Sequence, residues 1–145
     1  MSLQDPAVAL VLTDQPPADM RDLLGQGVSG FNVDRLGPTD ARPLAIAIER
    51  DGTLLGGLLG RTSFRRLFIE LLFVPESLRG QGVGRKLLAQ AETEAKARGC
   101  LGLWLDTFSA DAHRFYLRNG LKVFGQIEDY PPGNTRYFLS KDWPL

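Results

Sequence analysis

The segment RGQGVGRKLL, residues 79 to 88, places three glycines at alternate positions, flanks them with cations and then runs into leucines. Glycines let backbone N–H groups turn toward an anion, and a Cβ at these positions would block its close approach. A helix that starts here adds the partial positive charge of its N-terminus. The segment therefore indicates a phosphate-binding turn. A flexible loop is the alternative, because a glycine pattern alone is weak evidence.

Two common glycine-loop chemistries do not fit this segment. A nucleotide P-loop needs Ser or Thr after its lysine, but Lys86 is followed by Leu87, so no hydroxyl is available for magnesium. A dinucleotide fingerprint needs a wider last glycine spacing and an acidic residue about twenty residues further on. Residues 80 to 84 have the wrong spacing, and glycine and cysteine occupy positions 99 and 100. The ligand stays open at this point.

Cysteine and histidine chemistry is a weak alternative in this chain. Cys100 is the one cysteine, so the sequence predicts neither an intramolecular disulfide nor a metal cluster, and we expect no metal cofactor. As a nucleophile Cys100 would have only the distant His113 as a base, and a buried, inert thiol is the preferred interpretation. His113 itself is more typical of a surface residue.

Composition bounds the class of protein. A chain of 145 residues with 43% hydrophobic and 23% charged residues predicts a single domain over residues 1–145. Seventeen acidic and seventeen basic residues cancel, so no overall field favours nucleic acid or an anionic membrane, and we expect neither as a partner. The N-terminus MSLQDPAVAL lacks the basic start and long apolar run of a secretion signal, which predicts a cytoplasmic protein.

The elements that must position these residues follow from periodicity and turn signals. A helix from Pro17 is expected to give way at the glycines of 25–30 to a loop or a short second helix, and Val8 to Leu12 is a candidate for an additional strand. Further along, we expect two strands in 43–62 joined at Asp51-Gly52, a strand at 66–74, a helix at 82–98, a strand at 100–108, a helix at 109–119 capped by Ser109, and two closing strands around 131–134. This order predicts an α/β (α+β) fold with a mixed sheet.

The context of the glycines resembles the signature of the GNAT superfamily of acetyl-CoA-dependent N-acyltransferases. The family pattern is Arg or Gln, two residues, Gly, one residue, and Gly or Ala; Arg79, Gly82 and Gly84 meet it within LLFVPESLRGQGVGRKLL. The later segment ADAHRFYLRNGLKVFG is similar to the family's A-x-x-F-Y-x-x-x-G-F segment. The resemblance covers residues 43 to 141 and extends to small bacterial members. It implies a mixed, mostly antiparallel sheet of six to seven strands flanked by about four helices, with splayed central strands.

The resemblance also implies how acetyl-CoA is bound as a co-substrate without a metal. The pyrophosphate would lie on backbone N–H groups of a turn, and pantetheine would enter the splayed gap as if it were a strand. The residues implied to bind it are Leu72, Phe73, Val74, Arg79, Gly80, Gln81, Gly82, Val83, Gly84, Arg85, Ser109, Ala112 and Phe115. Ser109 departs from the family, where many members carry Asn, which leaves its contact open. Solvated cations at a helix start are the alternative for Arg79 and Arg85.

Two catalytic residues are implied for direct transfer of acetyl within a ternary complex. Glu70 interrupts the apolar strand LFIELLFV and matches a position that serves as a general base in some members; an ordinary strand carboxylate is the alternative. Tyr116 holds the usual general-acid position, and its alternative is packing beside Phe115. An N–H near Leu72 would polarise the thioester carbonyl.

The acceptor is expected to be a primary amine, on a small molecule or a peptide. Asp106, Glu128 and Asp129 hint at a cationic amine, although such a group of charges is usually a solvated rim. The protein is expected to be a monomer or a homodimer. A non-catalytic acyl-CoA-binding module on the same fold is the rival hypothesis, since a fold does not determine a function.

Overall fold

The computed structural model describes residues 5–144, which form two compact units. The first unit ends at Pro38 and contains helix α1 (Met20–Leu36). The second unit begins at Thr39 and contains the sheet and the remaining helices. The single domain expected from the sequence stays a prediction.

The first unit differs from the sequence prediction in two ways. α1 is one continuous helix that passes through Gly25, Gly27 and Gly30, so the expected break is wrong. A helical glycine costs about 1 kcal/mol relative to alanine, which weakens a helix without ending it. The expected strand from Val8 to Leu12 is also wrong: this segment pairs with no strand among residues 5–144, and a strand needs a neighbour for its backbone hydrogen bonds.

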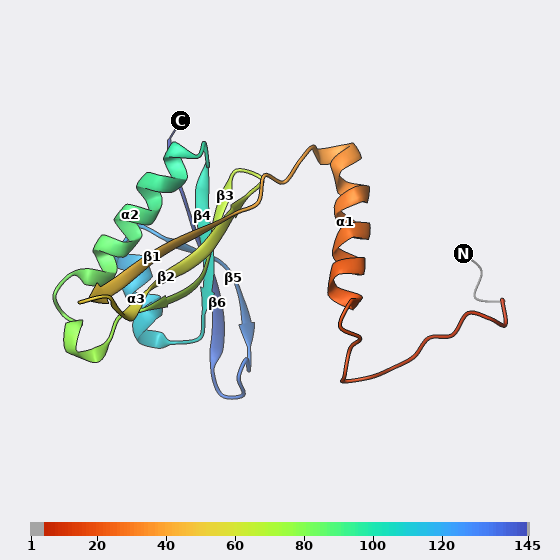
Figure 1. The fold of residues 1–145 in the computed structure, drawn as a ribbon. Coiled ribbons are helices and arrows are strands. Elements are labelled where there is room, and N and C mark those ends of the chain that lie inside the picture. The colour runs from red at the N-terminus through yellow and green to blue at the C-terminus, as the bar shows by residue number, and fades with distance from the viewer. Residues whose placement is uncertain (1–4, 145) are drawn as a thin grey trace. The chain divides into compact units, whose positions relative to one another are not determined.

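The second unit is a mixed six-stranded sheet in the order β1-β2-β3-β4-β6-β5 (Figure 1). All neighbours are antiparallel except β3 and β4, which are parallel. The strands are β1 (Arg42–Arg50), β2 (Thr53–Ser63), β3 (Arg66–Phe73), β4 (Gly102–Thr107), β5 (Lys122–Glu128) and β6 (Thr135–Asp142). The helices are α2 (Val83–Ala97), α3 (Ala110–Arg118) and the short 3-10 helix η1 (Glu76–Leu78). The α+β GNAT-like fold is confirmed, with three α-helices in the described residues instead of about four.

The turn between β1 and β2 forms where the sequence predicted it. Asp51 and Gly52 have φ values of 51° and 80°, so both central residues adopt the left-handed conformation of a two-residue hairpin turn. Gly52 tolerates this conformation at no steric cost because it lacks a Cβ. The hairpin sets the register between β1 and β2.

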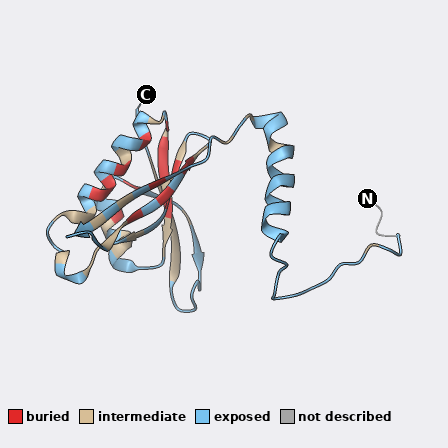
Figure 2. Cartoon of the chain, viewed as in Figure 1, coloured by how far each residue is buried: buried red, intermediate tan, exposed pale blue. Residues whose placement is uncertain are grey.

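The core lies between one face of the sheet and the two longer helices of this unit (Figure 2). α2 buries Leu87, Leu88, Ala91 and Ala95, which recur at helical spacing, against strand residues such as Leu103. α3 lies on the same face. Its His113 ring stacks on the Tyr137 ring with the centroids 3.9 Å apart. Tyr137 lies two residues before the fully buried Leu139 on β6, so both side chains are on the face of the sheet that carries the core.

The two parallel strands separate after a short stretch of pairing. β3 and β4 pair from Arg66 with Gly102 only as far as Phe68 with Trp104. On its other side β3 contains a bulge: Leu71 pairs with Leu59 and Ile69 pairs with Gly60, which leaves Glu70 as the extra residue. The expected splay of the central strands is therefore present, and Glu70 lies at its start.

The close approach of β2 and β3 beside the bulge depends on Gly60, where a Cβ would overlap the carbonyl oxygen of Phe68. We expect Gly60→Ala to lower the free energy of unfolding by about 1–3 kcal/mol, because a backbone oxygen cannot move aside as a side chain can. Urea denaturation measures the change. Gly125→Ala on β5 is the matched control, since a Cβ there has no neighbour within 4 Å. Equal losses in the two variants would contradict the argument.

Candidate active site

A cavity of about 1070 Å³ occupies the space where β3 and β4 separate. Residues 69–74 form one wall and residues 105–108 form another. The turn before α2, the inner side of α3 and Arg136 of β6 complete the lining. Strand ends, a helix start and a helix face therefore converge on one volume of the size that small-molecule sites have.

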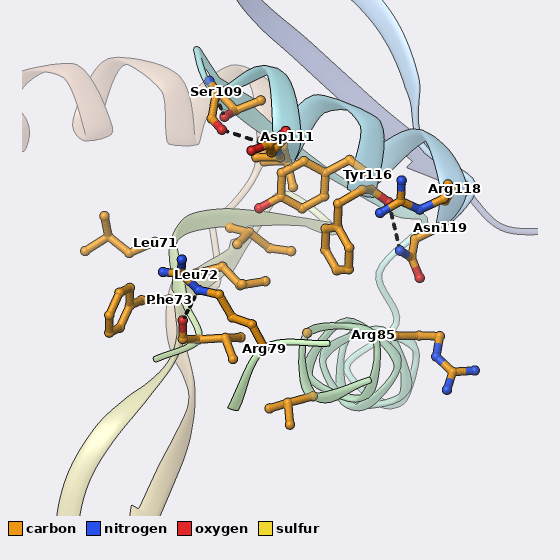
Figure 3. A pocket seen from close by; sticks show the side chains of 18 of the residues that line it. Leu71, Leu72, Phe73, Arg79, Arg85, Ser109, Asp111, Tyr116, Arg118 and Asn119 are labelled. Carbon is orange, nitrogen blue, oxygen red and sulfur yellow. Dashed lines mark hydrogen bonds between the residues drawn. The ribbon is translucent and has the colours of Figure 1, made fainter. Parts of the chain in front are cut away.

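The structure brings nearly all of the candidate residues from the sequence into this cavity (Figure 3). Those that line it are Glu70, Leu72, Phe73, Val74, Arg79, Gly80, Gly82, Val83, Gly84, Arg85, Ser109, Ala112, Phe115 and Tyr116. Gln81 is the exception: it does not line the cavity, and its side-chain Nε2 donates to the carbonyl oxygen of Ser77 at 3.2 Å. The side chain of Gln81 is therefore bound to the 3-10 helix η1 and not directed to the cavity.

The glycine cradle, residues 80–84, is built by backbone conformation. Gly80 and Gly82 have φ values of 73° and 79°, a left-handed conformation that favours glycine. Gly82 is the N-cap of α2, and its position supplies no side-chain cap to the helix. The first amides of a helix have no acceptor within the helix, so those of α2 can donate to an anion.

Gly84 serves a different purpose from the other two glycines. It has no left-handed φ, and a Cβ there would lie 3.0 Å from Cζ of Phe115. Its small size therefore lets α3 pack against the first turn of α2. Close approach of a ligand was expected to explain all three glycines, but packing against Phe115 is enough to explain Gly84.

Cations surround the cradle. The Arg79 Nε donates to the carbonyl oxygen of Val74 at 2.9 Å, and its guanidinium lies 6.0 Å from the centroid of the Phe73 ring. Arg79 is thereby tied to the end of β3. Arg85 extends in the other direction (Figure 3), and Arg118 at the end of α3 also lines the cavity. Arg79, Arg85 and Arg118 thus all border the cavity that the start of α2 lines.

Tyr116 is the buried polar group of the cavity wall. Its side chain is only 7% exposed, and burial raises the pKa of its phenol above the ordinary value of 10.0. The phenol therefore keeps its proton at neutral pH and can act as a donor. Figure 3 shows its hydroxyl on the side of the ring that faces Leu71 and Leu72 of β3.

The start of α3 fixes where Tyr116 points. Ser109 caps the helix as predicted, because its Oγ accepts from the backbone N–H of Ala112 at 3.2 Å. The N–H of Ser109 donates in turn to Oγ1 of Thr107 at 3.2 Å. The Ser109 oxygen thus has a structural partner, and the cap connects the orientation of α3 to the end of β4.

Glu70 reaches the cavity from the bulge of β3. Its neighbour Ile69 is 3% exposed and belongs to the core, whereas Glu70 is exposed and lines the cavity. An extra residue in a strand turns its side chain away from the regular alternation, which is how a carboxylate can sit in an apolar strand without entering the core. Glu70 and Tyr116 therefore border the same volume from different elements.

Arg136, like Arg118, lines the cavity and was not predicted from the sequence as a site residue. Its Nε donates to Oδ1 of Asp106 at 2.9 Å, and its Nη2 pairs with the same oxygen. A signal existed: Asp106 pairs with Phe138, and Arg136 lies two residues from Phe138, hence on the same face of the sheet. Finding it required the register between β4 and β6.

The three acidic residues considered for a cationic acceptor do not act together. Asp106 lines the cavity but is paired with Arg136. Glu128 does not line it and accepts from Gln126 at 2.7 Å. Asp129 accepts from the backbone N–H of Gly133 at 3.2 Å within the loop before β6. The three carboxylates therefore do not form one anionic subsite, and a cationic amine as acceptor stays an expectation.

The other chemistries considered from the sequence find no support at this site. Cys100 is 5% exposed in the core, burial raises the pKa of its thiol, and it does not line the cavity. In the described part of the chain, no group of three or more His, Cys, Asp or Glu side chains could hold a metal ion. None of the described helices is both long enough and apolar enough to cross a membrane.

A mixed sheet that opens between two parallel strands, with a helix N-terminus beside the opening, defines the class of acetyltransferases with a GNAT-like fold. Residues 16–121 match the acetyltransferase (GNAT) family, and the chain belongs to this family. It is similar to the acetyltransferase Atu2258 of Agrobacterium fabrum strain C58, with 40% identity over 90% of this chain and 96% of that protein.

Two further relatives support this assignment. A crystal structure of an acetyltransferase from Agrobacterium tumefaciens superposes with a TM-score of 0.90 at 39% identity, covering 94% of this chain and 100% of that one. The blasticidin-S acetyltransferase of Streptomyces morookaense is 39% identical over 71% of this chain and 79% of that protein. The protein is thus an acetyltransferase of the GNAT family.

Proposed function

We propose that this protein transfers the acetyl group of acetyl-CoA directly to a primary amine within a ternary complex. The observation that carries the proposal is the cavity between β3 and β4, which joins the glycine cradle to Glu70 and Tyr116. A relative that acetylates blasticidin S supports a small-molecule amine as the acceptor class. The expected cytoplasmic location stays a prediction.

The residues of the cradle fit a pyrophosphate. Backbone amides from Gln81 to Arg85 at the start of α2 would donate to its oxygens, and Arg79, Arg85 and Arg118 would balance its charge. A Cβ at Gly80 has no neighbour within 4 Å, so the space beside this part of the turn is open. Amides and guanidinium groups supply the positive charge, so this binding mode needs no metal.

The unpaired end of β3 fits the amide-containing arm of coenzyme A. Beyond Phe68 the edge of β3 that faces β4 has no strand partner among the described residues. Leu72, Phe73 and Val74 line the gap, and their backbone groups would pair with an extended chain that carries amides. A backbone N–H near Leu72 would then lie beside the thioester carbonyl and stabilise negative charge on its oxygen.

Glu70 is proposed as the general base. An alkylammonium with a pKa near that of lysine, about 10.4, is mostly unreactive at neutral pH, so transfer requires removal of a proton from the amine. Glu70 is the carboxylate that borders the cavity from the end of β3, and its solvent exposure allows the proton to leave directly or through water. Asp106 is less suited, because it is paired with Arg136.

Tyr116 is proposed as the general acid. Its buried phenol remains protonated at neutral pH and is directed toward β3. Protonation of the departing thiolate would complete the reaction, with the amine nitrogen bonded to the acetyl carbon and the sulfur bonded to hydrogen. A purely acyl-CoA-binding module would need neither Tyr116 nor Glu70, which is why their presence in one cavity favours an enzyme.

The cradle is tested by Gly82→Asp, with Gly82→Asn as the matched control. We expect acetyl-CoA at a hundred times its dissociation constant to stabilise the wild-type fold by about 2.7 kcal/mol. Gly82→Asp should abolish this stabilisation, because its carboxylate repels the pyrophosphate. Asn has nearly the same size as Asp and must adopt the same left-handed conformation, but it carries no charge. The Gly82→Asn variant should therefore bind acetyl-CoA more tightly than the Gly82→Asp variant. Thermal unfolding with and without acetyl-CoA measures both, and full stabilisation of the Asp variant would remove the cradle from the site.

The base is tested by Glu70→Gln. This change keeps the size of the side chain and removes its proton affinity, so turnover should fall by about 10² to 10⁴ and the acidic limb of the rate profile should move or vanish. Binding of acetyl-CoA should stay near wild type. Glu128→Gln is the control, since Glu128 lies outside the cavity. A loss smaller than about threefold at every pH would leave Glu70 as a strand residue.

The acid is tested by Tyr116→Phe. Turnover should fall by about 10², while the dissociation constant of acetyl-CoA changes little, because the hydroxyl contact strengthens only as the sulfur gains charge. Steady-state kinetics and a binding titration separate the two quantities. Tyr137→Phe is the control, because Tyr137 stacks on His113 and does not line the cavity. A fully active Tyr116→Phe variant would show that solvent protonates the thiolate.

A further inference from the structure

Arg136 lies on β6, next to β4 in the sheet, and lines the cavity from that side. Asp106 holds one edge of its guanidinium through Nε and Nη2. The guanidinium carbon lies 4.8 Å from the centroid of the Tyr130 ring and 5.3 Å from that of the Phe108 ring. A carboxylate and two aromatic rings therefore fix this cation in one orientation.

The guanidinium keeps donors for a ligand. Arginine has five N–H donors in a planar fork, and the ion pair with Asp106 engages only Nε and Nη2. Nη1 lies outside the ion pair. The side chain is 25% exposed, so solvent and a ligand can reach the guanidinium. Such a fork suits the two oxygens of a carboxylate or a phosphonate. Because the side chain is already ordered, binding an anion would cost little further conformational entropy.

The charges along the cavity select among amines. Glu70 on β3 is a carboxylate at the proposed position of the reacting amine. Arg136 on β6 is a cation that lines the same cavity. Asp106 is matched by Arg136 and cannot serve as a second anionic subsite. An acceptor that carries both an amine and an acidic group could place its amine at Glu70 and its acid at Arg136.

We propose that Arg136 determines acceptor specificity by binding the acidic group of an amino acid or aminophosphonate whose amine is acetylated. Asp106, Phe108 and Tyr130 act as positioning residues for its guanidinium. This inference rests on the proposed acetyl transfer, and it adds the chemical class of the acceptor. A carboxylate and a phosphonate share the recognition chemistry, and an acceptor assay distinguishes between them.

The test compares acceptors that differ only in the acidic group. The wild-type protein is assayed by thiol release with glycine, β-alanine and γ-aminobutyrate, with 2-aminoethylphosphonate, and with β-alaninamide as the uncharged match of β-alanine. We expect the best acid to have a kcat/KM at least about tenfold above that of its amide. The length series reports the spacing between the amine and Arg136, and the phosphonate arm identifies the preferred acid.

Variants locate the effect at Arg136. Arg136→Gln should raise KM for the preferred acid by about tenfold to a hundredfold with little change in kcat, and should leave the amide nearly unaffected. Arg136→Lys should recover part of the loss, since it restores charge without the fork. The double variant Arg136→Gln with Asp106→Asn avoids an unpaired carboxylate and should also lose the preference. Arg61→Gln is the matched control: Arg61 lies 4.9 Å from the Phe68 ring but does not line the cavity.

A binding titration separates this inference from the proposed function. The protein saturated with coenzyme A is titrated with each acid and with β-alaninamide, which requires no turnover. Tighter binding of an acid that disappears in Arg136→Gln supports recognition of the acidic group by Arg136, and thiol release with the same acid shows that its amine is acetylated. Equal binding of acid and amide, or equal losses for both in Arg136→Gln, overturns the role of Arg136 while the acetyl transfer can still stand.

Discussion

The end of the pairing between β3 and β4 is the constraint on which the rest of the site depends. The two parallel strands are bonded only as far as Phe68 and Trp104, whose rings stack with centroids 4.3 Å apart. Within the paired part, Leu67 and Leu103 are almost fully buried, and their packing in the core holds the two strands together there. Beyond Phe68, the backbone of β3 that faces β4 is unpaired and borders the cavity, where its polar groups need a hydrogen-bond partner. The core thereby holds open a gap that an extended ligand can fill.

Two small features direct chemistry into that gap. The bulge places Glu70 at the start of the separation, and the Ser109 cap fixes the helix that carries Tyr116. Gly84 lets Phe115 pack on the first turn of α2, which brings the Tyr116 helix next to the cradle. The positions of the proposed base, acid and cradle are therefore set by backbone geometry around one opening in the sheet.

Local signals were enough to predict the elements but not the contacts between them. Asp51-Gly52, the helical spacing of α2 and the Ser109 cap each depend on a few adjacent residues, and each was correct. The expected strand at 8–12 and the helix break at the glycines were wrong, because pairing partners and the continuity of a helix are not fixed by local pattern. Arg136 was missed because it joins the site through the register between β4 and β6.

The ion pair between Arg136 and Asp106 contributes more to the orientation of the guanidinium than to the stability of the fold. The two side chains are only 25% and 19% exposed, so the loss of hydration on burial offsets part of the gain from their pairing. What the pair does provide is orientation, because one carboxylate oxygen and two rings determine the plane of the guanidinium. The same carboxylate reduces the net charge of that wall. Recognition there therefore depends on directed hydrogen bonds more than on long-range attraction, and directed bonds distinguish an acid from an amide of equal size.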